Sequence, residues 1–338
     1  MGLATALPIF LEDSELALVA RVILSDIGHR QDEVPDGASY YDLPLSWFQQ
    51  APSEAEDFVE LYLQCVEEVK DFETYFGCLC DIHKRRRKYE RILSGQPLPT
   101  MAQVSPRALL EFGIIASPAL ASWMTWRKWF YDIDNRAAQE TGYLFEPILA
   151  ASLGGESYGA RNSPIRRRSD VKKGRQVDCV VEKIAYEFKL RVTIAASGQG
   201  RFAEELEFAR DCEAAGYTPV LLVLDPTPSS RLQELSAEFS RVGGEAHIGD
   251  QAWVHIEKQA GPTMATFVDK YVRRPIAEID VHAPKLLDLA IQATSNHSSF
   301  LIRLEGPSEN FKWEIKRSVD PSLATDGDIA PEDEAPLE

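Results

Sequence analysis

The chain has 338 residues, of which 44% are hydrophobic and 26% are charged, a balance that is ordinary for a globular protein with one large core or two modest ones. Its five cysteines are odd in number and irregularly spaced, which excludes a disulfide framework and favours a reducing, cytoplasmic compartment. The formal charge of −17 argues at first against a polyanionic partner, but residues 318–338 carry seven of the acids and no base. This acidic tail is expected to be disordered.

No segment predicts export or contact with a membrane. Glu12 and Asp13 interrupt the first apolar run, so a signal peptide is not expected. The longest apolar run, residues 108–126, contains Glu111 and Pro118, which indicates a buried helix pair rather than a membrane span.

Residues 1–100 are predicted to be mainly helical, because apolar residues recur three and four positions apart at 14–27 and 53–93. Residues 83–88 form a dense basic run in this region. The run is either a solvated helix end, favoured by the helix dipole, or a patch that contacts phosphates. Residues 95–106 contain three prolines and are expected to form a connector.

Two or three helices are expected after this connector, the last of them at 135–153. Glu146 lies on an apolar stripe of that last helix, beside Leu149, Ala150 and Leu153. It is either a glutamate that reaches out to solvent or an acid that points into a site shared with Asp178. Glu140 is the second candidate for that role.

Residues 158–175 form a basic loop with seven bases and one acid, a local charge of +6. The loop runs directly into residues 177–192, which read as a tight antiparallel hairpin with its turn at Glu182 and Lys183. Each strand of this hairpin carries charge that a buried strand normally lacks.

Asp178 interrupts the first strand, and Glu187 and Lys189 lie two apart on the second, so both point to one face while Tyr186 and Phe188 point to the other. Burying three charges costs several kcal/mol each unless they pair or bind a metal. The pattern Asp, eight residues, then Glu-x-Lys therefore indicates a functional site.

Beyond the hairpin, the small residues at 193–201 allow a close approach to a ligand, and Gln199 and Arg201 are expected to reach bases or phosphates there unless the segment is an ordinary turn. A helix at 203–215, ended by Gly216, and a strand at 219–224 complete a crossover to a parallel strand. The fold class predicted is α/β, a mixed sheet flanked by helices.

Further elements are expected towards the end of the chain. We expect a helix at 229–241, a strand at 245–248, a helix at 251–259 capped by Asp250, a helix opening at Thr263 and a hairpin from 300–304 and 311–316. His247, His255 and His282 have no spacing typical of a shared metal site and are expected to be structural.

Two converging carboxylates suit Mg²⁺, and a neighbouring lysine can orient or deprotonate an attacking water, a combination that favours phosphodiester hydrolysis. The sequence lacks a nucleophile elbow and a dinucleotide-binding fingerprint, so acyl transfer and a nucleotide cofactor are not expected.

This arrangement resembles the PD-(D/E)xK nuclease superfamily, with its restriction-endonuclease-like fold. The resemblance implies that Asp178 and Glu187 bind the divalent metal with the Phe188 carbonyl, that Lys189 positions the water and that Glu146 is a further core acid. Val177 stands where the motif has proline. The chain would then divide into a helical region (1–100), a nuclease core with appended helices (101–317) and the tail (318–338).

Three segments are similar in sequence to type II restriction endonucleases of the ApaLI-like family. They are AYEFKLRVTIAASGQGRF at 185–202, GYTPVLLVLD at 216–225 and AGPTM at 260–264. The resemblance covers roughly residues 140–275 and implies a homodimer that cuts a palindromic duplex, with GTGCAC as the candidate site. The residues expected to contact DNA are Asn162, Arg166, Arg167, Arg168, Lys172, Lys173, Gln199 and Arg201, among which arginines and amides suit guanine and adenine edges.

Three alternatives remain open at this point. One is a DNA repair or recombination nuclease of the same fold, and the second is a catalytically inactive DNA-binding protein. The third is a structural ion cluster in an unrelated α/β protein.

Overall fold

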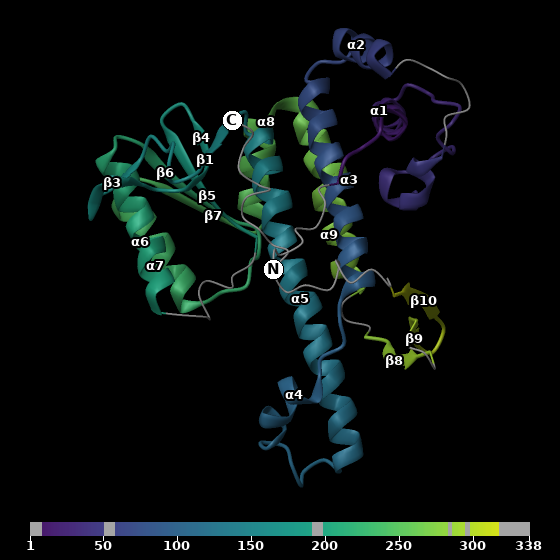
Figure 1. Ribbon diagram of the computed structural model, residues 1–338. Coiled ribbons are helices and arrows are strands. Elements are labelled where there is room, and N and C mark those ends of the chain that lie inside the picture. Colours follow the sequence, from purple (N-terminus) through teal and green to yellow (C-terminus); the bar gives the residue numbers. More distant parts are fainter. Residues whose placement is uncertain (1–8, 51–57, 191–198, 283–285, 295–297, 318–338) are drawn as a thin grey trace, which may run out of the picture.

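The computed structural model describes residues 9–50, 58–190, 199–282, 286–294 and 298–317 (Figure 1). At its centre is a five-stranded sheet in the order β1-β4-β5-β6-β7. These strands are β1 (Glu156–Tyr158), β4 (Val177–Val181), β5 (Ile184–Lys189), β6 (Thr218–Val223) and β7 (Glu245–Ile248). β1, β4 and β5 pair antiparallel, whereas β5, β6 and β7 pair parallel, which confirms the predicted mixed sheet.

Helices cover both faces of this sheet (Figure 1). α6 (Gln199–Ala214) and α7 (Ser230–Arg241) pack on one face, where Phe208 and Phe239 meet Leu221. α5 (Ser117–Ser152) and α8 (Asp250–Val268) pack on the other, against Val220 and Leu222. β6 is buried on both sides from Pro219 to Val223, which explains its continuous apolar sequence.

The N-terminal region is mainly helical, as predicted. It contains α1 (Asp13–Asp26), α2 (Phe58–Glu68), α3 (Phe72–Gly95) and two short 3₁₀ helices, Tyr40–Asp42 and Leu45–Gln49. One cluster of buried side chains continues from α1 through α3 to α5, α8 and the sheet. The N-terminal helices therefore share the core that supports the sheet, and the domain boundary at residue 100 stays a prediction.

Two expectations for residues 95–153 are wrong. The expected connector contains α4 (Met101–Ala108), whose start is capped where the Thr100 N–H donates to Gln103 Oε1 at 2.8 Å. A single helix of 36 residues, α5, replaces the two or three helices expected after it. Pro118 lies in the first turn of α5, where a backbone N–H makes no hydrogen bond within the helix. The lack of an N–H on proline therefore costs nothing there, and Pro118 starts the helix instead of breaking it.

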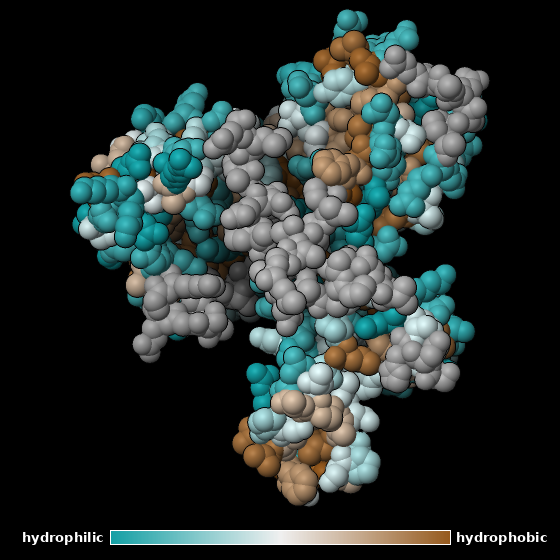
Figure 2. All heavy atoms as spheres, viewed as in Figure 1, coloured by the Kyte–Doolittle hydropathy of each residue, from teal (hydrophilic) through white to brown (hydrophobic). Residues whose placement is uncertain are grey.

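The apolar run at 108–126 is not the buried helix pair that its composition indicates. Leu110 is 85% exposed and Ile114 is 80% exposed, at the turn between α4 and α5. Figure 2 shows apolar side chains gathered at this free end of the α4–α5 arm. None of the described helices has the length and apolar character that crossing a bilayer requires.

The basic run at 83–88 lies within α3, so it is not the solvated helix end that was one of its two predicted interpretations. The other, a patch that contacts phosphates, stays a prediction. His83 is fully buried, with Nδ1 3.0 Å from the Tyr40 hydroxyl. Arg87 binds the buried carboxylate of Glu15 at 2.7 Å, and Arg85 and Lys88 bind Glu140. These bases hold α3 against α1 and α5, because each pairs with an acid distant in sequence.

The C-terminal elements follow the predictions with three corrections. Gly249, rather than Asp250, precedes the first turn of α8, whereas a break at Gly261, whose φ of +69° favours glycine, divides α8 into the two helices that were expected. A π-helical turn (Asp269–Arg273) and α9 (Arg274–His282) follow. β9 (Ser299–Glu305) and β10 (Asn310–Lys316) form the predicted hairpin, and β8 (Asp288–Ala293), which was not predicted, pairs with β9.

Candidate active site

The hairpin of β4 and β5 forms the floor of the candidate site. Val181 pairs with Ile184 across a turn in which Glu182 has a φ of +52°. Cys179 faces Tyr186 in the last pair of this ladder, beside Asp178 on β4 and Glu187 on β5. The Phe188 N–H donates a hydrogen bond of 2.8 Å to Asp178 Oδ2 and fixes this carboxylate against the second strand.

The pleat separates the charged and apolar side chains of β5 as expected. Tyr186 and Phe188 are buried against the α5 and α8 face. On the opposite face, Lys189 Nζ donates to Glu187 Oε1 at 2.7 Å. The hairpin thus presents two carboxylates and an ammonium to one side of the sheet.

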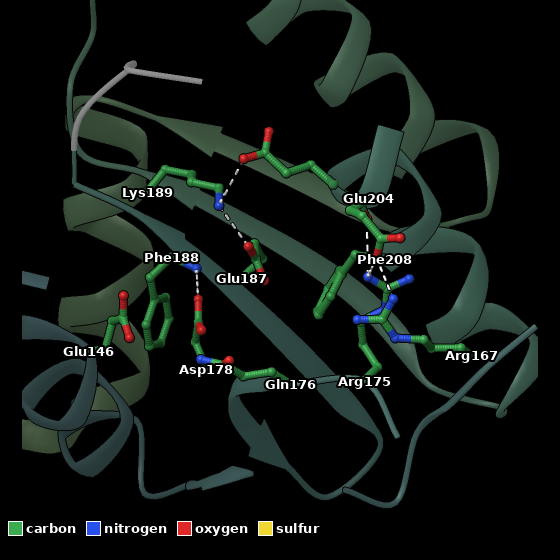
Figure 3. Close-up of a pocket in the computed structure, with 11 residues that line it drawn as sticks. Glu146, Arg167, Arg175, Gln176, Asp178, Glu187, Phe188, Lys189, Glu204 and Phe208 are labelled. Carbon is green, nitrogen blue, oxygen red and sulfur yellow. Dashed lines mark hydrogen bonds and ion pairs between the residues drawn. The ribbon is translucent and has the colours of Figure 1, made fainter. Parts of the chain in front are cut away.

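A cleft of about 510 Å³ opens over these groups. Figure 3 shows Glu146 approaching from α5 on one side, and Arg167 and Arg175 on the other, with Asp178 and Glu187 between them. The residues that line the cleft are Glu146, Arg167, Arg175, Gln176, Asp178, Glu187, Phe188, Lys189, Glu204, Glu205 and Phe208.

The approach of α5 to the hairpin depends on a glycine. A Cβ on Gly155 would lie 2.4 Å from Cys179 Sγ and 2.7 Å from the Val180 carbonyl, so a side chain there would push the end of α5 away from β4. Glu146, on the same helix, lines the cleft. Glu140, the second candidate, does not line the cleft and instead pairs with Arg85 at 3.0 Å and Lys88 at 2.9 Å.

The charges of the cleft perturb one another strongly. Burial, followed by repulsion from Glu187 and Glu146, raises the pKa of Asp178 well above its usual range, against the opposing effects of Lys189 and the Phe188 N–H. Burial alone lowers the pKa of Lys189, but the carboxylates of Glu187, Glu205 and Asp178 outweigh it and raise the pKa of the ammonium above its usual value. Lys189 is therefore a cation, and the carboxylates have more negative charge than it can balance.

Glu205 is a member of the site that the sequence analysis missed. Its Oε1 lies 3.4 Å from Lys189 Nζ, so the lysine is held between two carboxylates. The sequence contains a signal for it, since Glu205 shares a helical stripe with the buried residues Phe208, Ala209 and Cys212. The same reasoning drew attention to Glu146.

The basic loop is anchored to α6 through two acids. Arg175 is buried and donates through Nε to Asp211 Oδ2 at 2.8 Å, and the Arg168 N–H donates to Asp211 Oδ1 at 2.8 Å. Arg175 and Arg167 both bind Glu204, at 2.9 and 2.7 Å. These contacts hold β2 (Arg166–Arg167) and β3 (Asp170–Gly174) at the edge of the cleft.

The predicted DNA-contacting residues divide into three groups. Arg167 lines the cleft. Exposed on the loop outside it are Asn162, Arg166, Arg168, Lys172 and Lys173. Gln199 and Arg201 are in the first turn of α6, but their side chains, like residues 191–198, lie outside the described part of the structure.

The residues of the cleft fit a hard divalent cation. Glu146, Asp178 and Glu187 offer carboxylate oxygens, and mutual repulsion of these acids is what a bound cation would relieve. Phe188 also lines the cleft, and its carbonyl is a further oxygen donor. The Lys189 cation beside these carboxylates can stabilise the negative charge that develops in a reaction that passes through a pentavalent phosphorus.

Comparisons with known proteins agree with this chemistry. The ApaLI-like restriction endonuclease family matches residues 38–273. The chain is 47% identical over 345 residues to the type II restriction enzyme ApaLI of Acetobacter pasteurianus, a match that covers 94% of this chain and 91% of that protein. No solved structure matches the chain.

Proposed function

Since the chain belongs to the ApaLI-like family of type II restriction endonucleases, we propose that the hairpin cleft is the centre at which it hydrolyses double-stranded DNA. The observation that carries this proposal is the contact of 2.7 Å between Lys189 and Glu187 in the cleft that Asp178 also lines. A site-specific deoxyribonuclease needs acids that bind a divalent metal and a cation beside the scissile phosphate. This cleft has both within one hairpin.

Asp178 and Glu187, with the carbonyl of Phe188, would hold the metal, and Mg²⁺ is the ion proposed because all the donors are oxygens. When bound, the ion supplies a polarised water and neutralises phosphate charge. Glu146 faces the same space from α5 and is proposed as an additional acid that binds the ion through water.

Lys189 is proposed to orient the attacking water and to stabilise the charge that develops on the phosphate. Its raised pKa favours this role over that of a general base, because a lysine must lose its proton to accept one. Glu187 and Glu205 fix the ammonium on two sides. Hydrolysis adds the water oxygen to phosphorus and breaks one P–O ester bond. One proton of the water passes to a carboxylate of the cleft or to solvent, and the departing oxygen takes up a proton from solvent, so Lys189 keeps its own proton throughout.

The exposed bases of the loop are proposed to bind the DNA backbone and to place Arg166, Arg168 and Asn162 near base edges, with Gln199 and Arg201 on the neighbouring helix end. The proposed target is the palindrome GTGCAC. Because each chain contributes one such cleft and a duplex has two strands to cut, we propose that the enzyme acts as a homodimer in a reducing, cytoplasmic compartment.

A digestion experiment tests this function. Purified protein with phage DNA and Mg²⁺ is expected to give discrete fragments whose ends map to a single palindrome, and Asp178→Ala is expected to abolish them. Unspecific degradation would instead favour a repair or recombination nuclease. Retention of DNA without cleavage under Mg²⁺ or Mn²⁺ would favour an inactive DNA-binding protein.

A further inference from the structure

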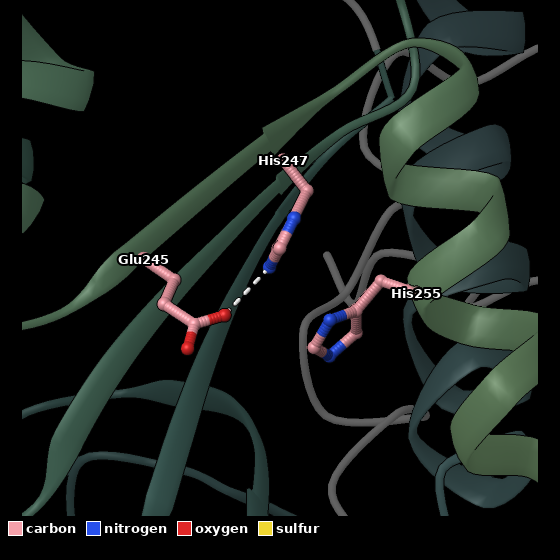
Figure 4. A group of neighbouring side chains, drawn as sticks. All are labelled: Glu245, His247 and His255. Atoms are coloured by element: carbon pink, nitrogen blue, oxygen red, sulfur yellow. Dashed lines mark hydrogen bonds and ion pairs between the residues drawn. The ribbon is translucent and has the colours of Figure 1, made fainter.

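A second group of metal-binding side chains lies on the far edge of the sheet (Figure 4). Glu245 and His247 extend from β7, and His255 extends from α8. Their ligand atoms all lie within 4.8 Å of one another. His247 Nε2 is 2.8 Å from Glu245 Oε2, and the two imidazole centroids are 4.4 Å apart. His247, His255 and His282 were expected to be structural, because their spacing is not typical of a shared metal site.

This group is separate from the hairpin cleft. Tyr186, Val220 and Glu245 stand in register across β5, β6 and β7, as do Phe188, Leu222 and His247. Both rows therefore share the face that packs against α8, whereas Glu187 and Lys189 lie on the opposite face. The strand β6 and the thickness of the sheet separate the two sites.

The donor set differs from that of the cleft in its chemistry. Two imidazoles and one carboxylate match the ligands that zinc takes in many proteins, with a fourth position left for water, whereas Mg²⁺ prefers oxygen donors. Zinc bonds of about 2.1 Å in a tetrahedral site place the ligand atoms about 3.4 Å from one another, so the His247–Glu245 pair, at 2.8 Å, must open slightly and His255 must adjust to it. Glu245 is exposed and both histidines are partly exposed, so small side-chain rotations can make this adjustment.

His255 already has the second contact that a metal-binding imidazole requires. Its Nε2 lies 3.3 Å from the Tyr186 hydroxyl, which leaves Nδ1 for a metal.

We propose that Glu245, His247 and His255 form a binding site for Zn²⁺ or a similar transition-metal ion, distinct from the metal site proposed in the cleft. The ion would join the edge strand β7 to α8. Because β7 is hydrogen-bonded only on its β6 side within the described sheet, such a link would protect the open edge. The bound metal therefore has a structural role and no part in cleavage.

The test uses the full-length, untagged protein after dialysis against a chelator, titrated with ZnCl₂ by calorimetry in excess MgCl₂. Binding is expected to saturate at one zinc per chain and to raise the midpoint of thermal unfolding. His247→Ala and His255→Ala are each expected to weaken binding by at least about 10-fold. His29→Ala, which removes an exposed histidine elsewhere, is the matched control and is expected to bind as the wild type does.

Asp178→Asn distinguishes this site from the cleft, because it is expected to keep full zinc affinity. Absence of saturable zinc binding would overturn the proposal, as would binding that survives in both histidine variants. Zinc binding that is lost in Asp178→Asn would place the ion in the cleft instead. Cleavage of DNA by His247→Ala with Mg²⁺ is a separate readout, so the proposed nuclease function and the zinc site can fail independently.

Discussion

The Phe188 N–H donates a hydrogen bond of 2.8 Å to Asp178 Oδ2, which joins the two strands of the hairpin at one of the acids of the cleft. This bond offsets only part of the cost of ionising Asp178, because burial and the charges of Glu187 and Glu146 still raise its pKa. The cleft therefore destabilises the folded chain when no cation is bound, as expected of a site shaped for function rather than stability.

Asp178→Asn is accordingly expected to stabilise the protein while it inactivates it. In chelator at pH 8 the variant loses a repelled carboxylate, and its free energy of unfolding in urea is expected to rise by about 0.5–2 kcal/mol. Its cleavage rate with Mg²⁺ is expected to fall at least about 1,000-fold, the loss of several kcal/mol of transition-state stabilisation. Asp288→Asn, on the exposed face of β8, is the control and should change neither quantity. A clear loss of stability in Asp178→Asn would contradict the assignment.

The raised pKa of Asp178 also predicts that metal binding depends on pH. A cation binds the ionised carboxylate, so its affinity is expected to increase as the pH rises through the pKa of Asp178 in the folded, metal-free protein, and binding should release protons. Calorimetry of Mg²⁺ binding in two buffers of different ionisation enthalpy measures that release. Asp178→Asn should abolish it, and equal heats in the two buffers for the wild type would show that Asp178 is already ionised.

Asp211→Ala is expected to be among the most destabilising single substitutions near the cleft. Asp211 is 1% exposed and accepts from Arg175, so its removal leaves a buried guanidinium without its main partner, at a cost of about 3–5 kcal/mol in urea unfolding. Asp170→Ala is the matched control, because the Asp170 side chain is 41% exposed and lies 3.5 Å from Lys173, a pair that contributes less than about 1 kcal/mol. Equal effects of the two substitutions would contradict the anchoring role of Arg175.

The exposed bases of the loop are expected to set the salt dependence of DNA binding. Each of Arg166→Ala, Arg168→Ala and Lys172→Ala should reduce the slope of log affinity against log salt by about 0.9 if it removes one phosphate contact. Fluorescence anisotropy with Ca²⁺, which is expected to support binding without cleavage, measures this slope. Lys312→Ala, an exposed lysine on β10, should leave it unchanged. Three unchanged slopes would place the DNA elsewhere.

The hairpin was predictable because the residues that determine its strands and its turn are close together in the sequence. The alternation of charged and apolar residues from Tyr186 to Lys189 determines which side chain points to which face, and only one register buries the aromatic pair. The strand, helix and strand that follow were predictable for the same reason. Glu146 was identified as an acid on an apolar stripe of a helix, and Glu205 lies on an apolar stripe of the same kind.

Features that depend on packing between distant segments were not predictable. Glu15 and Glu140 pair with the basic run on α3, but nothing in the run itself identifies its partners. The proximity of His247 to His255 depends on how α8 returns across the sheet. Pro118 was expected to interrupt a helix, because the sequence around it does not show that α5 begins only one residue before it.

The central claim is that Lys189, held by Glu187, takes part directly in phosphodiester hydrolysis. Single-turnover cleavage of a short duplex containing GTGCAC, with duplex affinity measured in Ca²⁺, compares Lys189→Ala with Lys183→Ala, an exposed lysine at the turn of the same hairpin. Lys189→Ala is expected to lose at least about 1,000-fold in rate, with its affinity for the duplex little changed, while Lys183→Ala cleaves as the wild type does. Cleavage by Lys189→Ala at the wild-type rate would contradict this account.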